Sequence, residues 1–392
     1  HRGGRGRHHR IGNGIRLAQL ALGAMSTLFF FGTLRHLPLL AIVLDRPVNS
    51  LDVGDDSLPG YRADAVAEGP FPILIQDENA AAPGVVVAGL TDADRARIDY
   101  YEAGFHYALV DCTTTGGAAA QVYMADAGQW TTDGPWDLDA WVQRWGVMTE
   151  CAAREIMAGF GRVPPEEVAR TFPRIRARAW SKVLARQGRH GAGTYAGRVE
   201  IVQRVQTYSD FFALEDIELR HERFDGSMSE VLRRAVFVSN DAAILLPYDP
   251  VRDRVLLVEQ IRLGPIGRAD PTVWQLEPIA GLIDPGEAPA DAARREAMEE
   301  AHLTLHRLEP VGECYASPGA ATDFFHLFVG LCDLPDDAAR IGGAVDEGEN
   351  IRSHLMAFDD LLAMAEDRRT ANTPLTLLVY WLAHHRGRLA VG

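Results

Sequence analysis

Cysteine is scarce in this chain of 392 residues, and the few that occur are far apart. Cys112, Cys151, Cys314 and Cys332 form no Cys-x-x-Cys pair, and no histidine is placed to complete a zinc-binding set. This spacing excludes a zinc finger and a small disulfide-stapled scaffold. It favours reduced thiols in the cytoplasm, although four separated cysteines can also form bridges in an oxidising compartment.

Positive charge is also in deficit. The 39 Lys and Arg residues face 54 Asp and Glu residues, which gives a formal net charge of −15. Duplex nucleic acid is held mainly by many Lys and Arg contacts to phosphate, so nucleic acid is not an expected partner. A small anionic substrate is compatible with this charge if local arginines or a divalent cation neutralise it.

The chain lacks an uninterrupted apolar run that is long enough to span a membrane. Residues 17–34 are the most apolar stretch, but no A-x-A site closes it and four polar residues interrupt it: Gln19, Ser26, Thr27 and Thr33. We therefore expect no membrane segment. Residues 1–24, rich in Arg, His and Gly, are interpreted as an extension or a cloning remnant, with Met25 as the natural start and residues 26–31 as the first buried strand.

What is present is an ordinary globular composition, with 47% hydrophobic and 24% charged residues. At roughly 100 to 200 residues per domain, the length predicts two or three domains. Short apolar runs punctuated by Gly or Pro, such as residues 71–75 and 84–88, predict strands of a small α+β domain over residues 25–125.

The rest of the chain divides into two parts. Helical spacing followed by a Gly-rich stretch predicts a helical bridge and linker over residues 126–198. From residue 199 to 392 strands and helices alternate, which predicts a mixed α/β domain.

Three glutamates share one face of a predicted helix over residues 290–301. Glu299 and Glu300 follow Glu296 by three and four residues, and like charges at that spacing repel. A divalent cation relieves this repulsion, and Mg²⁺ prefers such hard oxygen ligands. The alternative is a solvated face whose repulsion is offset by Arg294 and Arg295.

The spacing of the whole segment 281–303 resembles the Nudix box, G-x5-E-x7-R-E-U-x-E-E-x-G-U, in which U is an aliphatic residue. The matching residues are Gly281, Glu287, Arg295, Glu296, Ala297, Glu299, Glu300 and Leu303. This resemblance implies a Nudix hydrolase domain, an α/β/α sandwich with a mixed sheet.

The resemblance also implies roles for the residues of the box. Glu296 and Glu300 are the main ligands of Mg²⁺, or of Mn²⁺, and the carbonyl of Ala280 is a further ligand. Glu299 is a supporting catalytic carboxylate. The structural residues of the box are Gly281, Glu287 and Arg295.

One position departs from the box, because His302 stands where the family usually has glycine. Glycine lets a helix end in the left-handed conformation without a Cβ penalty. Histidine enters that region at a cost of about 1 kcal/mol, so we expect a strained helix end and an intact metal site.

The flanks of the box resemble the ADP-ribose pyrophosphatase subfamily, in which a Ser-Pro-Gly and then a carboxylate follow the box. Residues 317–319 and Asp323 fill this pattern, which implies that Asp323 positions or deprotonates the attacking water. The subfamily usually has the longer Glu there, so Glu347 and Glu349 are the alternatives.

The same resemblance implies substrate contacts. Arg262 meets the diphosphate, since its planar fork suits oxyanions, and Glu277 lies near the ribose or adenosine end. Arg233 or Arg234 can also reach a phosphate. The alternative for Arg262 is a surface charge at the end of a strand.

The implied reaction is hydrolysis of ADP-ribose, or of a related nucleoside diphosphate sugar, to AMP and ribose 5-phosphate. The substrate is a small molecule, and the resemblance implies a homodimer that shares its substrate pockets.

The N-terminal part resembles the γ-glutamylcyclotransferase-like (AIG2-like) fold, a small β-barrel-like α+β domain. Residues 29–35 (FFFGTLR) match its Gly turn, and residues 98–107 (IDYYEAGFHY) place Glu102 at the position of its catalytic base. In the alternative, Glu102 pairs with Arg95 or Arg97 and the domain only binds or scaffolds.

The combination of the two domains also resembles proteins linked to tellurite resistance. Two other functions stay open beside the diphosphatase: a mainly γ-glutamylcyclotransferase enzyme, and a sensor that binds a nucleotide without cleaving it. The three clustered glutamates argue against the sensor, because a pure binder has no need of them.

Overall fold

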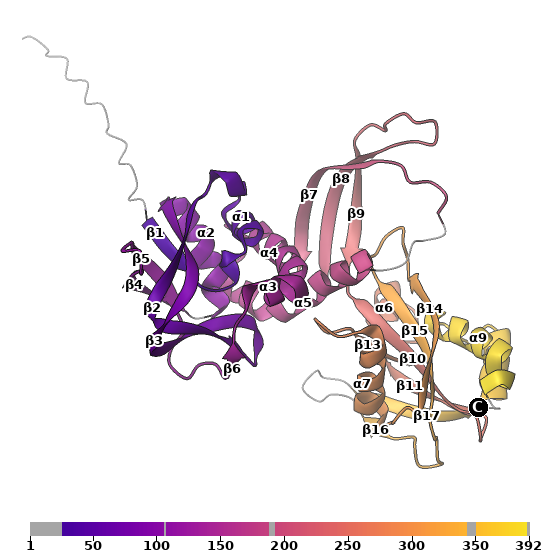
Figure 1. Ribbon diagram of the computed structural model, residues 1–392. Coiled ribbons are helices and arrows are strands. Elements are labelled where there is room, and N and C mark those ends of the chain that lie inside the picture. The colour runs from indigo at the N-terminus through magenta and orange to yellow at the C-terminus, as the bar shows by residue number, and fades with distance from the viewer. Residues whose placement is uncertain (1–25, 106, 188–192, 343–349, 390–392) are drawn as a thin grey trace, which may run out of the picture.

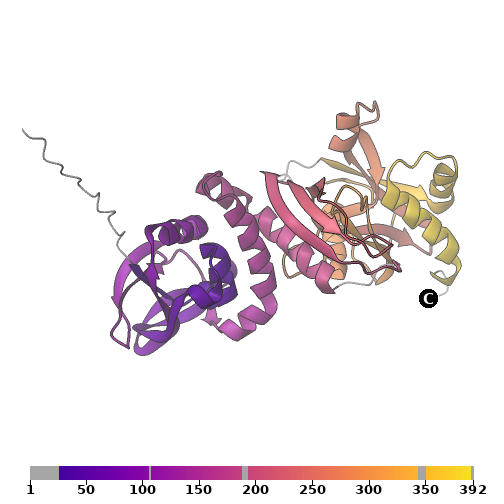
Figure 2. The same cartoon turned by 90° about the horizontal axis from the view of Figure 1, so that it is seen from above.

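In the computed structural model, two helices lie between an N-terminal sheet and two C-terminal sheets (Figure 1). These helices are α4 (Val147–Ala158) and α5 (Pro165–Gln187), and the view from above shows the same order (Figure 2). The structure describes residues 26–105, 107–187, 193–342 and 350–389. The predicted extension over residues 1–24 and the predicted start at Met25 lie outside the described residues.

The N-terminal sheet has six strands in the order β4-β5-β1-β3-β2-β6. They are β1 (Ser26–Phe30), β2 (Asp52–Val66), β3 (Gly69–Leu90), β4 (Ala108–Thr113), β5 (Ala119–Met124) and β6 (Thr132–Pro135). Strand β6 lies within the segment that the sequence assigns to the bridge. The small α+β fold is as predicted.

Strand β1 is buried on both of its faces. Leu28 and Phe30 belong to the main hydrophobic core, whereas Phe29 and Phe31, whose side chains alternate with theirs, belong to a second cluster across the sheet. A strand with two covered faces needs a continuous apolar run, which explains the sequence Leu-Phe-Phe-Phe.

The two strands expected at residues 71–75 and 84–88 are one strand, β3. It pairs with β2 from Val66 opposite Gly69 to Asp52 opposite Ala88, with register shifts on the way. The polar residues between the two apolar runs stay in the ladder, because backbone hydrogen bonds do not require apolar side chains.

Helices of the N-terminal half cover this sheet. Helix α2 begins at a capping box, in which the backbone N–H of Asp94 donates to Thr91 Oγ1 at 3.1 Å and the backbone N–H of Thr91 donates to Asp94 Oδ2 at 2.9 Å. It ends at Glu102. The helices before α4 are α1 (Leu37–Leu44), α2 (Asp92–Glu102) and α3 (Leu138–Trp141), with a π-helical turn Val142–Gly146 and 3₁₀ turns Thr33–Arg35, Val48–Ser50 and Ala103–Phe105.

The bridge is packed into the molecule. One hydrophobic core contains Val87 of β3, Ile156 of α4, Trp180 of α5 and Ala293 of α7 (Pro289–Ala301). The indole N–H of Trp180 donates to the carbonyl of Glu287 at 3.2 Å. Helix α5 therefore contacts both halves of the chain.

A three-stranded antiparallel sheet follows, in the order β7-β8-β9. Its strands are β7 (Val199–Ser209), β8 (Ala213–His221) and β9 (Leu232–Val238). The turn between β7 and β8 lies against α5, because the guanidinium of Arg178 donates to the carbonyls of Asp210 and Phe211 at 3.0 Å each.

The last sheet has eight strands and is mixed. Strands β10 and β15 pair in parallel and the other pairs are antiparallel, in the order β14-β15-β10-β11-β17-β16 with β12 beside β11 and β13 beside β10. They are β10 (Asp241–Asp249), β11 (Arg254–Ile261), β12 (Trp274–Glu277), β13 (Ile279–Leu282), β14 (Arg307–Tyr315), β15 (Phe324–Leu331), β16 (Ile341–Gly342) and β17 (Ile351–Ala357).

Helices cover both faces of the eight-stranded sheet. Side chains of α7 pack on one face, in the same core as the bridge. Helices α8 (Phe358–Glu366) and α9 (Thr373–Leu389) pack on the other face, and α6 (Leu263–Arg268) follows β11. This is the α/β/α sandwich that the sequence predicts, and it holds β10 buried along its whole length.

All four cysteines are free thiols, as the sequence predicts. Over the described ranges, no helix is both long and apolar enough to cross a membrane.

Candidate active site

A cavity of about 840 Å³ opens between α7, strands β10 and β13 of the eight-stranded sheet, and the β7–β8 turn. It gathers nine of the residues that the sequence singles out: Arg262, Glu277, Ala280, Gly281, Arg295, Glu296, Glu299, Glu300 and Asp323. Residues that are far apart in the sequence thus line one space.

Helix α7 carries four of these side chains into the cavity. It begins with Pro289, whose missing N–H costs nothing in the first turn. It ends at His302, which has φ 53° and ψ 36°, so the left-handed helix end predicted for this histidine is confirmed. The backbone N–H groups of His302 and Leu303 donate to Met298 and Ala297.

Arg295 holds the carboxylates of the box together. Its Nε donates to Glu287 at 3.0 Å, and its Nη1 donates to Glu296 at 2.5 Å and to Glu299 at 3.0 Å. Glu287, and after it Glu296, raise the pKa of Arg295 above its ordinary value. Arg295 therefore stays charged and fixes the spacing of the acidic side chains.

Gly281 gives Glu296 its place. A Cβ at this position would lie 1.8 Å from Glu296 Oε1, so any other residue would push the carboxylate away from β13. The same glycine precedes Leu282, whose carbonyl accepts a hydrogen bond from Arg295 at 3.0 Å.

The donor chemistry of this wall fits a divalent cation. Glu296, Glu299, Glu300 and the backbone at Ala280 offer hard oxygen atoms, which are the ligands that Mg²⁺ prefers. Glu300 is 6% exposed, whereas the side chain of Glu299 is 58% exposed. Within the described ranges, however, no three His, Cys, Asp or Glu side chains are gathered around a metal position, and Arg295 contacts two of the glutamates.

A second group of polar residues lines the same cavity. Arg262 donates to Glu277 Oε2 at 2.7 Å, and the amide of Asn372 donates to Glu277 Oε1 at 3.0 Å. Glu277 is buried and therefore orients both partners.

Other predicted residues lie elsewhere. Arg233 is exposed on β9, pairs with Asp216 at 2.5 Å and does not line the cavity; neither does Arg234. Glu347 and Glu349, the alternatives to Asp323, lie outside the described residues.

The sequence analysis does not single out the other residues of the cavity wall, among them Arg174, Phe211, Phe212, Asn240 and Asn372. Asn240 precedes an apolar run, which is a usable signal for a polar group at a strand end. Nothing in the sequence relates Arg174, in the bridge, to a cavity built by the C-terminal half.

A separate cavity of about 90 Å³ lies in the N-terminal half. Aromatic side chains dominate its wall, together with Glu102, Gly32 and Arg176 of α5. Burial raises the pKa of Glu102 to about 8 and lowers the pKa of Arg176.

The alternative pairing of Glu102 is wrong. Arg95 bonds Asp99 and Gln121, and Arg97 donates to the carbonyl of Val43 at 2.7 Å. Neither arginine contacts Glu102, and its burial in a cavity lined mainly by apolar side chains favours the neutral form of the carboxyl group.

Comparison with known proteins matches two family models to the chain. Residues 239–376 match the NUDIX domain, and residues 28–140 match the model described as gamma-glutamyl cyclotransferase, AIG2-like. The NUDIX match contains the three glutamates of α7, and the AIG2-like match contains Glu102 of the smaller cavity.

Curated proteins similar to this chain over about half of its length are named as pyrophosphatases. The chain is similar to an ADP-ribose pyrophosphatase of Escherichia coli, with 40% identity over 191 residues, which are 49% of this chain and 90% of that protein. An ADP-ribose pyrophosphatase of Haemophilus influenzae is 33% identical over 188 residues, 47% of this chain and 85% of its own length. A GDP-mannose pyrophosphatase of Cronobacter sakazakii is 33% identical over 183 residues, 46% of this chain and 93% of its own length.

These relatives are covered almost from end to end, and the domain match includes the helix on which the three glutamates share a cavity with Arg262. The chain belongs to the Nudix family.

Proposed function

We propose that this chain hydrolyses the diphosphate of ADP-ribose, or of a related nucleoside diphosphate sugar, and releases AMP and ribose 5-phosphate from ADP-ribose. The observation that carries the proposal is the single cavity that joins Glu296, Glu299 and Glu300 to Arg262 and Asp323. Relatives named ADP-ribose pyrophosphatase and GDP-mannose pyrophosphatase support this substrate class.

In this proposal Glu296, Glu300 and the carbonyl of Ala280 hold Mg²⁺ or Mn²⁺, with Glu299 in support. The cation, when bound, neutralises charge that develops on the phosphate oxygens. Arg295 keeps the carboxylates in register through its bonds to Glu287 and Glu296.

The other side chains act on the substrate and on water. Arg262, oriented by Glu277, binds the diphosphate with its planar fork. Asp323 takes the proton of the attacking water, with Glu347 or Glu349 as the alternative. Arg233 lies outside the cavity of its own chain, so it would reach a substrate only in a homodimer with shared pockets.

We assign each proposed activity to one domain of the chain. We assign residues 25–125 to a γ-glutamylcyclotransferase-like domain, 126–198 to the bridge and 199–392 to the Nudix domain. The protein is proposed to act in the cytoplasm as a homodimer, on small molecules and not on nucleic acid.

The proposed reaction should depend on a divalent cation. The purified chain is expected to release AMP from ADP-ribose in Mg²⁺ and to lose at least about 100-fold in rate in EDTA, since a catalytic cation supplies several kcal/mol of charge stabilisation. The measurement is AMP formation by chromatography, with GDP-mannose and γ-glutamyl peptides in parallel and with Mn²⁺ in place of Mg²⁺. Equal turnover with and without EDTA contradicts the proposal.

A second activity is favoured by one observation, the carboxyl group of Glu102 in the aromatic cavity beside Gly32. This arrangement supports a metal-independent γ-glutamylcyclotransferase reaction in which Glu102 accepts a proton from the substrate amine.

The pH dependence of that activity follows from Glu102. Because its pKa is about 8, about a tenth of the population is ionised at pH 7 and about nine tenths at pH 9, so the rate should rise about tenfold over this range. Glu102→Gln should abolish it and leave AMP release from ADP-ribose unchanged. The measurement is 5-oxoproline formation from γ-glutamyl amines against pH; a flat profile, or turnover in the variant, excludes Glu102 as the base.

A further inference from the structure

Three arginines line the Nudix cavity, and two of them are engaged by carboxylates. Arg295 contacts Glu287, Glu296 and Glu299, and Arg262 contacts Glu277. Arg174, from helix α5, forms no ion pair with any residue that the structure describes. Its guanidinium lies over the ring of Phe211, 4.2 Å from the ring centre.

The charge of the cavity makes this third guanidinium important. Six carboxylates line the space with these three arginines: Glu277, Asp284, Glu296, Glu299, Glu300 and Asp323. An anionic diphosphate that enters such a space needs cations that are not already neutralised. Arg262 can still donate to the diphosphate, but Glu277 already offsets its charge; among the described arginines of this wall, Arg174 is the one without a carboxylate partner.

The stacking of Arg174 on Phe211 suits an anion. A guanidinium that lies over an aromatic ring uses its face for that contact, and its N–H groups project along the edge of the plane. That edge is the part that forms paired hydrogen bonds with phosphate oxygens. Phe211 therefore supports Arg174 without competing for its hydrogen-bond donors.

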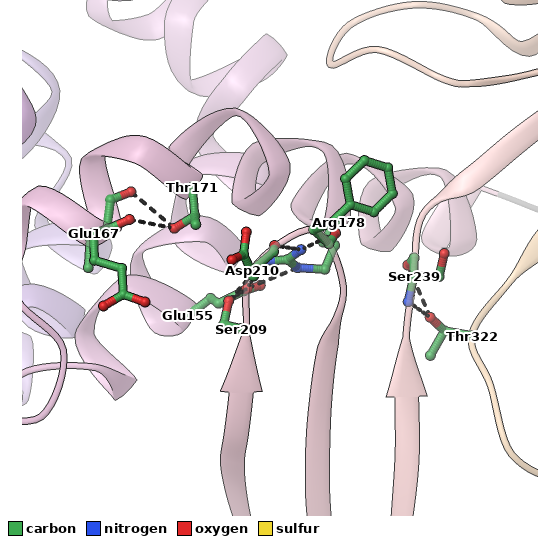
Figure 3. Close-up of polar contacts among 10 residues, drawn as sticks. Glu155, Glu167, Thr171, Arg178, Ser209, Asp210, Ser239 and Thr322 are labelled. Carbon is green, nitrogen blue, oxygen red and sulfur yellow. Dashed lines mark hydrogen bonds and ion pairs between the residues drawn. The ribbon is translucent and has the colours of Figure 1, made fainter. Parts of the chain in front are cut away.

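A buried network holds this pair in place. Arg178, 1% exposed and one helical turn after Arg174, donates to Glu155 at 2.6 and 2.9 Å, to Ser209 Oγ at 3.0 Å and to the carbonyls of the β7–β8 turn (Figure 3). On the same turn Asp210 accepts a bond from Arg170 at 3.1 Å. The turn that carries Phe211 is thus fixed to the helix that carries Arg174.

We propose that Arg174 is a substrate-binding residue, contributed by the bridge, which binds a phosphate of the nucleoside diphosphate. It lies outside residues 239–376, the range that matches the NUDIX domain, so this contact is a property of the fused chain. The inference rests on the proposed function for its substrate, and its test includes a ligand that is not turned over.

The test uses the full-length chain with Arg174→Ala, Arg174→Lys and the control Arg186→Ala. Arg186 is an exposed residue of the same helix and does not line the cavity. In saturating Mg²⁺, Arg174→Ala should raise the KM for ADP-ribose about tenfold or more, with kcat changed less than about twofold, because a hydrogen bond to a charged group is lost in substrate binding. Arg174→Lys should recover part of the lost substrate affinity, because lysine keeps the positive charge but lacks the planar fork of donors.

Competitive inhibition separates a phosphate contact from a change in the shape of the wall. The inhibition constant of AMP should rise in Arg174→Ala, whereas that of adenosine should stay the same. An equal rise for both ligands, an unchanged KM, or the same change in Arg186→Ala overturns the inference.

A binding measurement keeps the inference testable on its own. Titration calorimetry with inorganic pyrophosphate and Mg²⁺ should give weaker binding to Arg174→Ala than to the unmodified chain. If the unmodified chain cleaves no nucleoside diphosphate sugar, the proposed function fails, while this difference still decides the role of Arg174. Equal pyrophosphate affinities for the two proteins reject it.

Discussion

Replacing Glu300 by glutamine is expected to reduce the hydrolysis of ADP-ribose by at least about 100-fold, since loss of even an outer partner of a metal ligand costs about 10- to 100-fold. Glutamine keeps the size and one oxygen of the side chain but removes the negative charge that a cation needs. Glu300 is buried at the end of α7, where the two shapes fit equally, so folding should change little.

The comparison is made on the initial rate of AMP release and on the thermal unfolding temperature of each protein. Glu366→Gln is the matched control, because it makes the same change on the exposed surface of α8. The control should keep full activity. Full activity in Glu300→Gln, with an unchanged unfolding temperature, would refute the role of the acidic face.

Replacing Arg178 by methionine should lower the free energy of unfolding by about 3–5 kcal/mol, because it leaves a buried partner charge without compensation. That partner is Glu155, whose side chain is buried beside Arg178. The same change removes the donors that hold the carbonyls of Asp210 and Phe211.

Denaturant unfolding followed by circular dichroism measures this loss. Arg186→Met, the same substitution at an exposed position of α5, should cost almost nothing. The double variant Arg178→Met with Glu155→Leu should recover much of the loss, since it removes the orphan charge. Equal midpoints for Arg178→Met and Arg186→Met would show that the ion pair does not stabilise the fold.

Features that depend only on residues close together in the sequence can be predicted from local patterns. The spacing of Glu296, Glu299 and Glu300 predicts a shared helical face, because three and four residues complete about one turn. The left-handed conformation of His302 could be predicted for the same reason, since a helix end is a local event.

Patterns of hydrophobicity were less informative where a ladder continues through polar residues. Strand β3 runs through residues 76–83, in which polar side chains interrupt the apolar runs, so two strands were expected where one exists. Cross-strand pairing with β2 decides that outcome, and the sequence of β3 alone does not contain it.

Contacts between distant segments could not be read from the sequence. Arg174 and Asn240 line the cavity only because α5 and the start of β10 meet there, joined by the bond from the backbone N–H of Asp241 to Ser181 Oγ at 2.7 Å. Asn240 is 3% exposed, and neither atom of its amide has a hydrogen-bond partner among the described residues. Both positions depend on tertiary packing.

Helix α5 sends Arg174 to one cavity and Arg176 to the other, two positions apart and roughly 200° around the helix axis. A protein that begins after the glycine-rich segment would therefore lack the part of the C-terminal cavity wall that α5 supplies. Under the proposed role of Arg174, the truncated chain would keep its acidic helix but bind its substrate with one arginine fewer, so its kinetics would differ from those of the intact protein.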